Sequence, residues 1–155
     1  MPTIGLDTLA DRAVRELGAV LVTTTVIVPD GTEVARVQST HPQVYAVGDR
    51  KKLDPEHTSP AWMKTVVHGQ EPFFGSDRAA VREFFVDWAA IERLGCSSII
   101  NTPVVDDGET IGSVNFLAPE GTFDQRSVEH ALKLTAEAVP AVARARELAF
   151  PELAR

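Results

Sequence analysis

The sequence predicts an α+β domain in which helices pack against one central antiparallel β-sheet. Segments rich in β-branched residues occur as two pairs, and each pair is joined at a tight-turn signal, Pro29-Asp30-Gly31 and Asp107-Gly108. Helical periodicity lies near both ends of the chain. A chain of 155 residues buries roughly 68–70% of its unfolded surface, so we expect a single domain over residues 1–155.

The first elements of the chain are expected to be one helix and one hairpin. Apolar residues at helical spacing, followed by Gly18, predict an amphipathic helix over residues 6–17. Residues 19–28 are mostly β-branched and apolar, which favours a strand. After the turn, residues 33–40 are expected to return beside it as the second strand.

The middle of the chain combines irregular sequence with helical segments. Residues 41–75 are expected to be loops with one short helix over residues 60–68. A firmer helix is expected to begin at Ser76 or Asp77 and to end at Leu94. Its buried face is predicted by apolar residues at helical spacing, namely Val81, Phe84, Phe85, Trp88 and Ile91.

A second hairpin is expected from residues 98–105 and 110–118, and its turn predicts the pairing of the strands. If Asp106 lies opposite Glu109, four polar residues share one face of the sheet: Ser98, Thr102, Ser113 and Asn115. A face that mixes such residues with apolar ones suits the floor of a pocket, and Asn115 is the residue that we most expect to contact a ligand. Asn101 falls on the opposite face, where the pattern offers no explanation for it.

The last element is expected to be a long helix that begins at the Thr122–Gln125 capping pattern or at Asp124. Apolar residues at helical spacing continue as far as Val142. Pro140 lies inside this helix and is expected to bend or break it.

Composition excludes several classes of partner. The formal net charge of -7 opposes binding to nucleic acid, which depends on Lys and Arg at the phosphates. No apolar run approaches the roughly 20 residues that span a bilayer. A single cysteine, Cys96, cannot form an internal disulfide, and the N-terminus does not resemble a secretory signal, so we expect a cytoplasmic protein. The four histidines lack metal-ligand spacing, so no metal is predicted.

The second hairpin resembles the signature of GAF domains. It reads LGCSSIINTPVV over residues 94–105 and DGETIGSVNFL over residues 107–117, and Gly121, Phe123 and Asp124 match the family's ending. The resemblance implies a GAF/PAS-like antiparallel sheet, with the N- and C-terminal helices on one face. Loops and short helices over the other face would form a ligand cavity. It also implies a sensory domain that binds a small molecule of unknown identity.

Candidate ligand contacts outside the hairpin come from the segment expected to cover the cavity. Aromatic residues concentrate between positions 45 and 88. Trp62, Phe73 and Phe74 lie beside loops, where rigid side chains can stack on a ligand. His68 lies in the same segment and can serve as a hydrogen-bonding group.

Three functions remain open from sequence. The first is a stand-alone sensory domain, expected because the chain ends about where the fold ends. It would signal to a protein partner and form a homodimer through the first and last helices. The second is a small enzyme that uses His68 or His41 as base, with Cys96 or Asp87 assisting. The third is an interaction module whose cavity is filled by its own Trp62 and Phe74.

Overall fold

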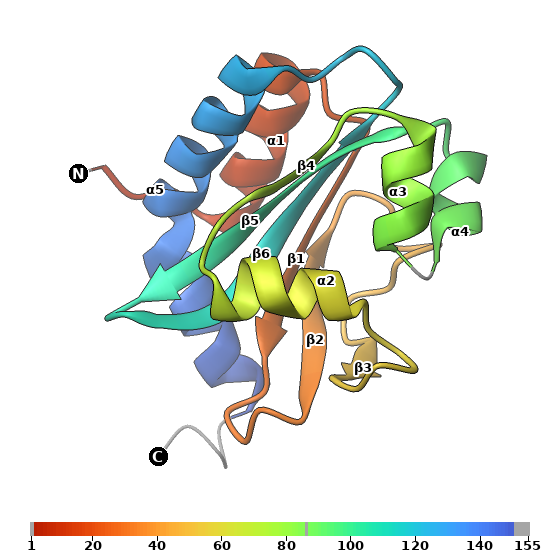
Figure 1. The fold of residues 1–155 in the computed structure, drawn as a ribbon. Coiled ribbons are helices and arrows are strands. Elements are labelled where there is room, and N and C mark those ends of the chain that lie inside the picture. The colour runs from red at the N-terminus through yellow and green to blue at the C-terminus, as the bar shows by residue number, and fades with distance from the viewer. Residues whose placement is uncertain (1, 86, 151–155) are drawn as a thin grey trace.

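A six-stranded antiparallel sheet with strand order β3-β2-β1-β6-β5-β4 forms the centre of the molecule (Figure 1). The computed structural model describes residues 2–85 and 87–150. The strands are β1 (Leu21–Ile27), β2 (Glu33–Ser39), β3 (Arg50–Lys52), β4 (Phe73–Gly75), β5 (Ser98–Asp106) and β6 (Glu109–Ala118).

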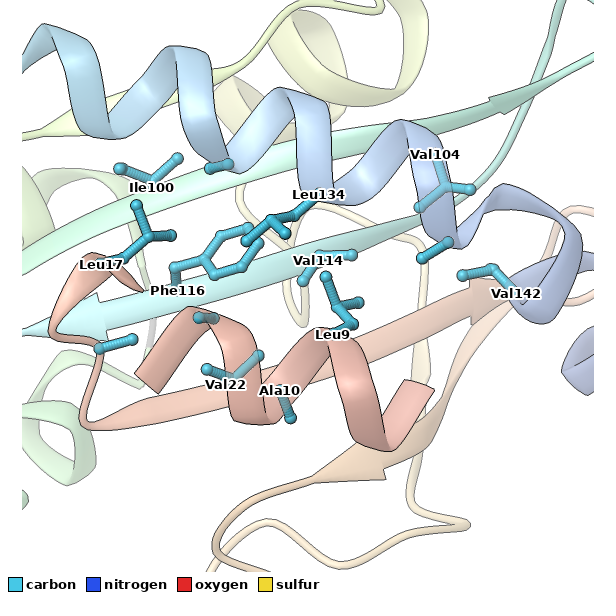
Figure 2. Close-up of a cluster of buried hydrophobic side chains, with 14 of the residues drawn as sticks. Leu9, Ala10, Leu17, Val22, Ile100, Val104, Val114, Phe116, Leu134 and Val142 are labelled. Atoms are coloured by element: carbon cyan, nitrogen blue, oxygen red, sulfur yellow. The ribbon is translucent and has the colours of Figure 1, made fainter. Parts of the chain in front are cut away.

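Two helices cover one face of this sheet. Helix α1 (Leu6–Leu17) and helix α5 (Gln125–Ala149) lie side by side there (Figure 1). Apolar side chains from both helices meet those of β1, β5 and β6 in the main core (Figure 2). The fully buried members of this core include Leu9, Val22, Ile100, Val114, Phe116 and Leu134. The predicted placement of the terminal helices on one face is confirmed.

The terminal helices follow the sequence closely. Helix α1 has the predicted bounds, and Gly18 ends it in the left-handed conformation, with φ 76°. Asp124 caps α5, because its side chain accepts from the Ser127 N–H while the Ser127 hydroxyl accepts from the Asp124 N–H. The helix continues through Pro140 without a break, which leaves a bend as the remaining alternative of the two that were expected there.

Shorter helices and loops lie over the other face. Helix α2 (Pro60–Trp62) continues directly into a π-helical segment, η1 (Met63–His68). The single helix expected over residues 76–94 is instead two helices, α3 (Arg78–Phe84) and α4 (Trp88–Arg93). The division occurs because Phe85 takes an extended conformation, with φ -116° and ψ 131°.

The hairpin of β5 and β6 contains a one-residue bulge that changes the predicted faces. Its turn has positive φ at Asp107 (52°) and Gly108 (80°), as a tight two-residue turn requires. Val105 pairs with Thr110, but Val104 pairs with Gly112, so Ile111 is the extra residue. Beyond the bulge each residue of β5 pairs one position further along β6 than the predicted pairing allows.

The bulge corrects the predicted floor of the pocket. Thr102 pairs with Val114 rather than with Ser113, and Asn101 pairs with Asn115. Because side chains alternate along a strand, Ser98 and Thr102 lie on the face covered by helices, and the shared face predicted for the four polar residues is wrong. Asn101 joins Ser113 and Asn115 on the other face.

Close approach of two strands explains the glycine next to the bulge. A Cβ atom built at Gly112 would lie 2.2 Å from the carbonyl oxygen of Thr25 on β1. No side chain fits at this distance, so glycine is needed where β6 passes β1.

The two edge strands were not predicted. Strands β3 and β4 have three residues each and pair with the sheet on one side. Residues 50–52 are all charged, which indicates a solvated turn rather than a strand. Among the described residues, none of the helices is both long and apolar enough to cross a bilayer.

Candidate functional site

A cavity of ≈ 290 Å³ lies on the sheet face opposite α1 and α5. Strands β1, β2, β5 and β6 supply its floor, and β3 contributes Arg50 and Lys51. Its walls come from the segments that cover this face: Tyr45, Thr58, Ser59, Trp62, Phe85, Asp87 and Ile91. The cavity therefore lies where the family resemblance places it.

Strand pairing arranges the floor as three rows that run across the strands. In order they are an apolar row, an amide row and a hydroxyl row: Leu21, Leu117 and Ile99; Thr23, Asn115 and Asn101; and Arg36, Thr25 and Ser113. Each row is two residues from the next along a strand, because only alternate residues face the cavity. The floor thus changes from apolar to polar and cationic along the strands.

A directed chain of hydrogen bonds runs along the amide row. The indole Nε1–H of Trp62 donates to Asn101 Oδ1 at 3.0 Å, and Asn101 Nδ2 donates to Asn115 Oδ1. Asn115 Nδ2 then donates to Thr23 Oγ1 at 2.9 Å. The second N–H of each amide and the Thr23 hydroxyl proton have no acceptor among the described residues. The row therefore presents donors to the cavity.

The hydroxyl row offers further donors. Thr25 Oγ1 and Ser113 Oγ lie 3.0 Å apart and share one hydrogen bond, so one hydroxyl proton of the pair is left over. Arg36 Nη1 donates to the Ala46 carbonyl and to Asp49 Oδ2, both at 3.2 Å. The Arg36 Nε–H is buried and has no acceptor among the described residues.

Tyr45 and Asp87 form the wall beside Arg36. The guanidinium carbon of Arg36 lies 5.0 Å from the centre of the Tyr45 ring, and the Tyr45 hydroxyl donates to Asp87 Oδ2 at 3.2 Å. Burial, with the Asp87 carboxylate as second cause, raises the pKa of Tyr45 well above its ordinary value. Tyr45 is therefore a protonated donor throughout the physiological range.

Three of the eight predicted site residues line the cavity. Ser113 and Asn115 lie on its floor, and Trp62 forms a wall that is held to the floor by its hydrogen bond with Asn101. The predicted ligand contact at Asn115 is placed at the centre of the amide row. Its contact with a ligand remains a prediction.

The other five predicted residues lie outside the cavity lining. Phe73 stacks on Phe84 with ring centres 3.5 Å apart, whereas Phe74 packs against the core beneath α1 and α5. His68 is exposed at the end of η1. On the helix face, the Ser98 hydroxyl donates to the Gly75 carbonyl at 3.3 Å, and Thr102 shares a 2.7 Å hydrogen bond with Thr135 of α5.

Sequence reasoning missed several residues of the lining, namely Thr23, Thr25, Arg36, Tyr45 and Asn101. The run Thr23-Thr24-Thr25 hides its alternation, because Thr24 is also polar and bonds Gln38 on the other face. Asn101 was placed on the wrong face by the missed bulge. The one signal that could have corrected it is Asn101 itself, an amide without explanation on a face expected to be apolar.

The groups considered for catalysis do not assemble. Cys96 is fully buried, and burial raises the pKa of its thiol to about 11, so it is a neutral thiol near pH 7. His41 Nδ1 lies 2.9 Å from Thr40 Oγ1, and neither His41 nor His68 lines the cavity. Over residues 2–85 and 87–150, no three His, Cys, Asp or Glu side chains gather as metal ligands do. The arrangement suits binding through hydrogen bonds.

The sequence profile of the GAF domain family matches residues 4–143. This chain belongs to the GAF domain family. Members of the family are usually sensory or regulatory domains, and the sheet of this GAF domain, with helices on both faces, is the fold of its solved relatives. The predicted family and fold class are thereby confirmed.

Solved structures similar to this GAF domain come from several protein classes. One is the GAF domain of a phosphoenolpyruvate-protein phosphotransferase from Coxiella burnetii, 17% identical, with a TM-score of 0.71 over 92% of this chain and 83% of that one. Another is the GAF domain of a two-component sensor histidine kinase from Bacillus halodurans, 11% identical, with a TM-score of 0.67 over 92% and 96%.

An enzyme also shares the fold. The type II free methionine-R-sulfoxide reductase from Thermoplasma acidophilum is 12% identical, with a TM-score of 0.63 over 89% of both chains. No curated protein matches this chain. At such identities the likeness extends to the fold alone, so the ligand has to be argued from the cavity of this GAF domain.

The amide row gives a test by mutation. We expect Asn115→Leu to reduce the free energy of unfolding by about 1–3 kcal/mol, because it leaves the buried Asn101 N–H and Thr23 hydroxyl without their partner. Asn101→Leu should have a similar effect. In urea denaturation, the double variant should lose less than the sum of the two single losses, since the bond between the amides is removed only once. Additive losses would show that the amides do not interact.

Proposed function

We propose that this GAF domain is a regulatory domain that binds a small molecule on the amide row of its cavity. The observation that carries the proposal is the set of unused donors on Asn101, Asn115 and Thr23, which face a space of ≈ 290 Å³. A ligand with acceptor atoms can bond to these donors in the cavity, as the few placed polar groups of a binding pocket do.

The alternative of a cavity filled by its own aromatic residues has less support. Trp62 stands at the wall, where its indole N–H is bonded to Asn101, and Phe74 packs on the other side of the sheet. Neither side chain occupies the space. The alternative of an enzyme has less support too, because Cys96 is buried and the candidate histidines lie outside the cavity lining.

The floor strands offer a direct route from the cavity to the terminal helices. On β6, Ser113 and Asn115 face the cavity, whereas Val114 and Phe116 pack beneath α1 and α5. A ligand that hydrogen-bonds to the amide row therefore acts on β6, the strand whose other face packs against α1 and α5. We place the output of the domain at these two helices.

The partner that we propose for this output is a second copy of the chain. Helices α1 and α5 are joined by two ion pairs, since Glu16 of α1 lies 2.7 Å from His130 of α5 and Arg12 of α1 lies 3.5 Å from Glu137 of α5. Their outer surface carries Val14 of α1 and Leu148 of α5, which are 45% and 69% exposed. A symmetric pairing of helices would bury such residues on both copies at once.

A matched pair of substitutions tests the ligand site. Thr23→Val removes a hydroxyl of the amide row from the cavity face, and Thr102→Val removes one from the helix face. In a thermal-shift screen of metabolites smaller than the cavity, we expect a hit at about 100 times its Kd to stabilise the wild type by roughly 2.7 kcal/mol, or roughly 5–10 °C.

The hit should lose a third to a half, roughly, of this shift in Thr23→Val, because one lost hydrogen bond costs about 1 kcal/mol, and keep it in Thr102→Val. Each shift is measured against the melting temperature of the same variant without compound, which removes any effect on stability alone. A screen without hits among anions, cations and neutral compounds would contradict the proposal. Hits that bind both variants equally would place the site elsewhere.

Sedimentation velocity tests the proposed pairing. We expect a dimer at micromolar concentration, and we expect Val14→Glu to shift it toward monomer because the substitution brings two carboxylates into a symmetric contact. Val44→Glu is the control, since Val44 is similarly exposed at 47% but lies in the loop before β3. A monomeric wild type would remove the pairing and leave the ligand site untouched.

A further inference from the structure

We propose that the cavity takes a small organic anion, a carboxylate with a short apolar chain, with its head between the amide and hydroxyl rows and its chain toward the apolar row. This inference rests on the proposed function and names the class of ligand. It depends on the order of the three rows, on the unused edge of Arg36 and on the charges around the cavity.

The spacing of the rows suits a carboxylate. Neighbouring rows are two residues apart along a strand, which is about 6.6 Å. A carboxylate centred between the amide and hydroxyl rows is therefore about 3.3 Å from each, measured along the strands. Its two oxygens offer about four acceptor sites. The donors that need acceptors lie on both sides of it: the amide N–H of Asn115, the hydroxyl of Thr23, and the spare hydroxyl proton of the Thr25–Ser113 pair.

Arg36 keeps the edge of its guanidinium that carboxylates prefer. Both hydrogen bonds that the Arg36 side chain donates within the described residues use Nη1. Its buried Nε–H has no acceptor there, and Nε and Nη2 together form the edge that binds a carboxylate through two parallel bonds. The guanidinium is also held in place by Tyr45, on whose ring it lies at 5.0 Å. A donor that is already oriented loses less side-chain entropy when a ligand binds.

The charges around the cavity favour an anion over a cation. Arg36 and Lys51 line the cavity, against the two acids Asp49 and Asp87. Arg50 lines it too, but its guanidinium pairs with Glu33 at 2.6 Å and lies over the Phe150 ring, so it is not counted. Both acids are already engaged: Asp49 pairs with Arg36 Nη1, and Asp87 accepts from the Tyr45 hydroxyl. Asp49 is also 62% exposed on its side chain, so solvent screens its charge. The buried acceptors that a ligand ammonium would need are therefore fewer than the donors that a carboxylate meets.

The apolar row limits the rest of the ligand. Leu21, Leu117 and Ile99 lie about 6.6 Å beyond the amide row and are buried by packing against Ile91 and Phe85, which limits the room at that end of the cavity. A chain of four to six carbons, roughly, spans that distance from the head and keeps its end in van der Waals contact with this row. A cavity of ≈ 290 Å³ is at the lower end of known ligand pockets, which agrees with a ligand of this size.

Three probes of equal length separate the possible head groups. Isothermal titration calorimetry of the whole protein with hexanoate, hexanamide and hexylamine presents an anion, a neutral isostere and a cation on the same chain. We expect hexanoate to bind at least about 10-fold more tightly than hexanamide, because a carboxylate carries a negative charge and two acceptor oxygens for the guanidinium of Arg36, whereas the neutral amide has one. We expect hexylamine to bind more weakly than either.

The variants test the role assigned to Arg36. In Arg36→Met the advantage of hexanoate over hexanamide should disappear, while hexanamide keeps its affinity. Arg82→Met is the matched control, since Arg82 also stacks on an aromatic ring, that of Trp88 at 4.6 Å, and also pairs with a carboxylate, Glu92, but lies outside the cavity lining. If Arg36→Met does not fold, Arg36→Lys keeps the charge without the two-donor edge, and it should lose several-fold in hexanoate affinity.

The failures of this inference and of the proposed function are distinguishable. Equal affinities for hexanoate and hexanamide, or tighter binding of hexylamine, would overturn the anion class and leave the cavity as a binding site. The same holds if none of the three probes binds while the metabolite screen yields a hit that depends on Thr23. Full hexanoate affinity in Arg36→Lys would overturn the role assigned to the two-donor edge of Arg36. Failure of the proposed function requires that screen to fail as well.

Discussion

The pairing of β5 with β6 is the constraint on which the candidate site depends. One extra residue at Ile111 shifts the register beyond the turn, and this shift brings Asn101 opposite Asn115. Without it, Asn115 would share a face with Thr102 and Ser98, and Asn101 would point into the helix core. The same bulge is followed by Gly112, where the β6 backbone passes too close to β1 for any side chain. A local irregularity thus decides the chemistry of both faces of the sheet.

The two faces of the sheet divide stability from binding. On the helix face, buried apolar residues such as Val114 and Phe116 pack beneath α1 and α5, and the hydroxyl of Thr102 is satisfied by Thr135. On the cavity face, the polar side chains bond one another only in part, so donors remain. Since neighbouring residues of one strand serve both faces, a change in the amide row acts on the core over a distance of one residue. In the function that we propose, a ligand on the cavity face would therefore act on the helix core without a hinge.

Much of the fold could be predicted because its signals are local. The bounds of α1 follow from apolar spacing and Gly18, and both hairpins follow from their turn residues. The division between α3 and α4 could not be predicted, because Phe85 fits the helical spacing and leaves the helix only in its tertiary setting. The edge strand β3 could not be predicted for a similar reason, since its three charged residues show no alternation of polar and apolar types and form a strand only by pairing with β2.

The site was predicted less completely than the fold. Ser113, Asn115 and Trp62 line the cavity as expected, because polar residues on a strand and an aromatic residue beside a loop can be recognised in the sequence. Ser98 and Thr102 were misplaced because a bulge of one residue leaves no mark in the alternation of a strand that is buried on both faces. Arg36 and Tyr45 reach the cavity from separate segments, and their meeting is a property of the folded chain.

The side-chain contacts of Asn101 test this account most directly. In a nuclear Overhauser spectrum, the account predicts contacts from the Asn101 side-chain amide to the Asn115 side chain and to the Trp62 indole N–H, and from the Thr102 methyl group to Thr135 of α5. Contacts from the Asn101 amide to side chains of α5, with Thr102 lying opposite Ser113, would contradict it, because they would restore the hairpin without its bulge and remove the donor row from the cavity.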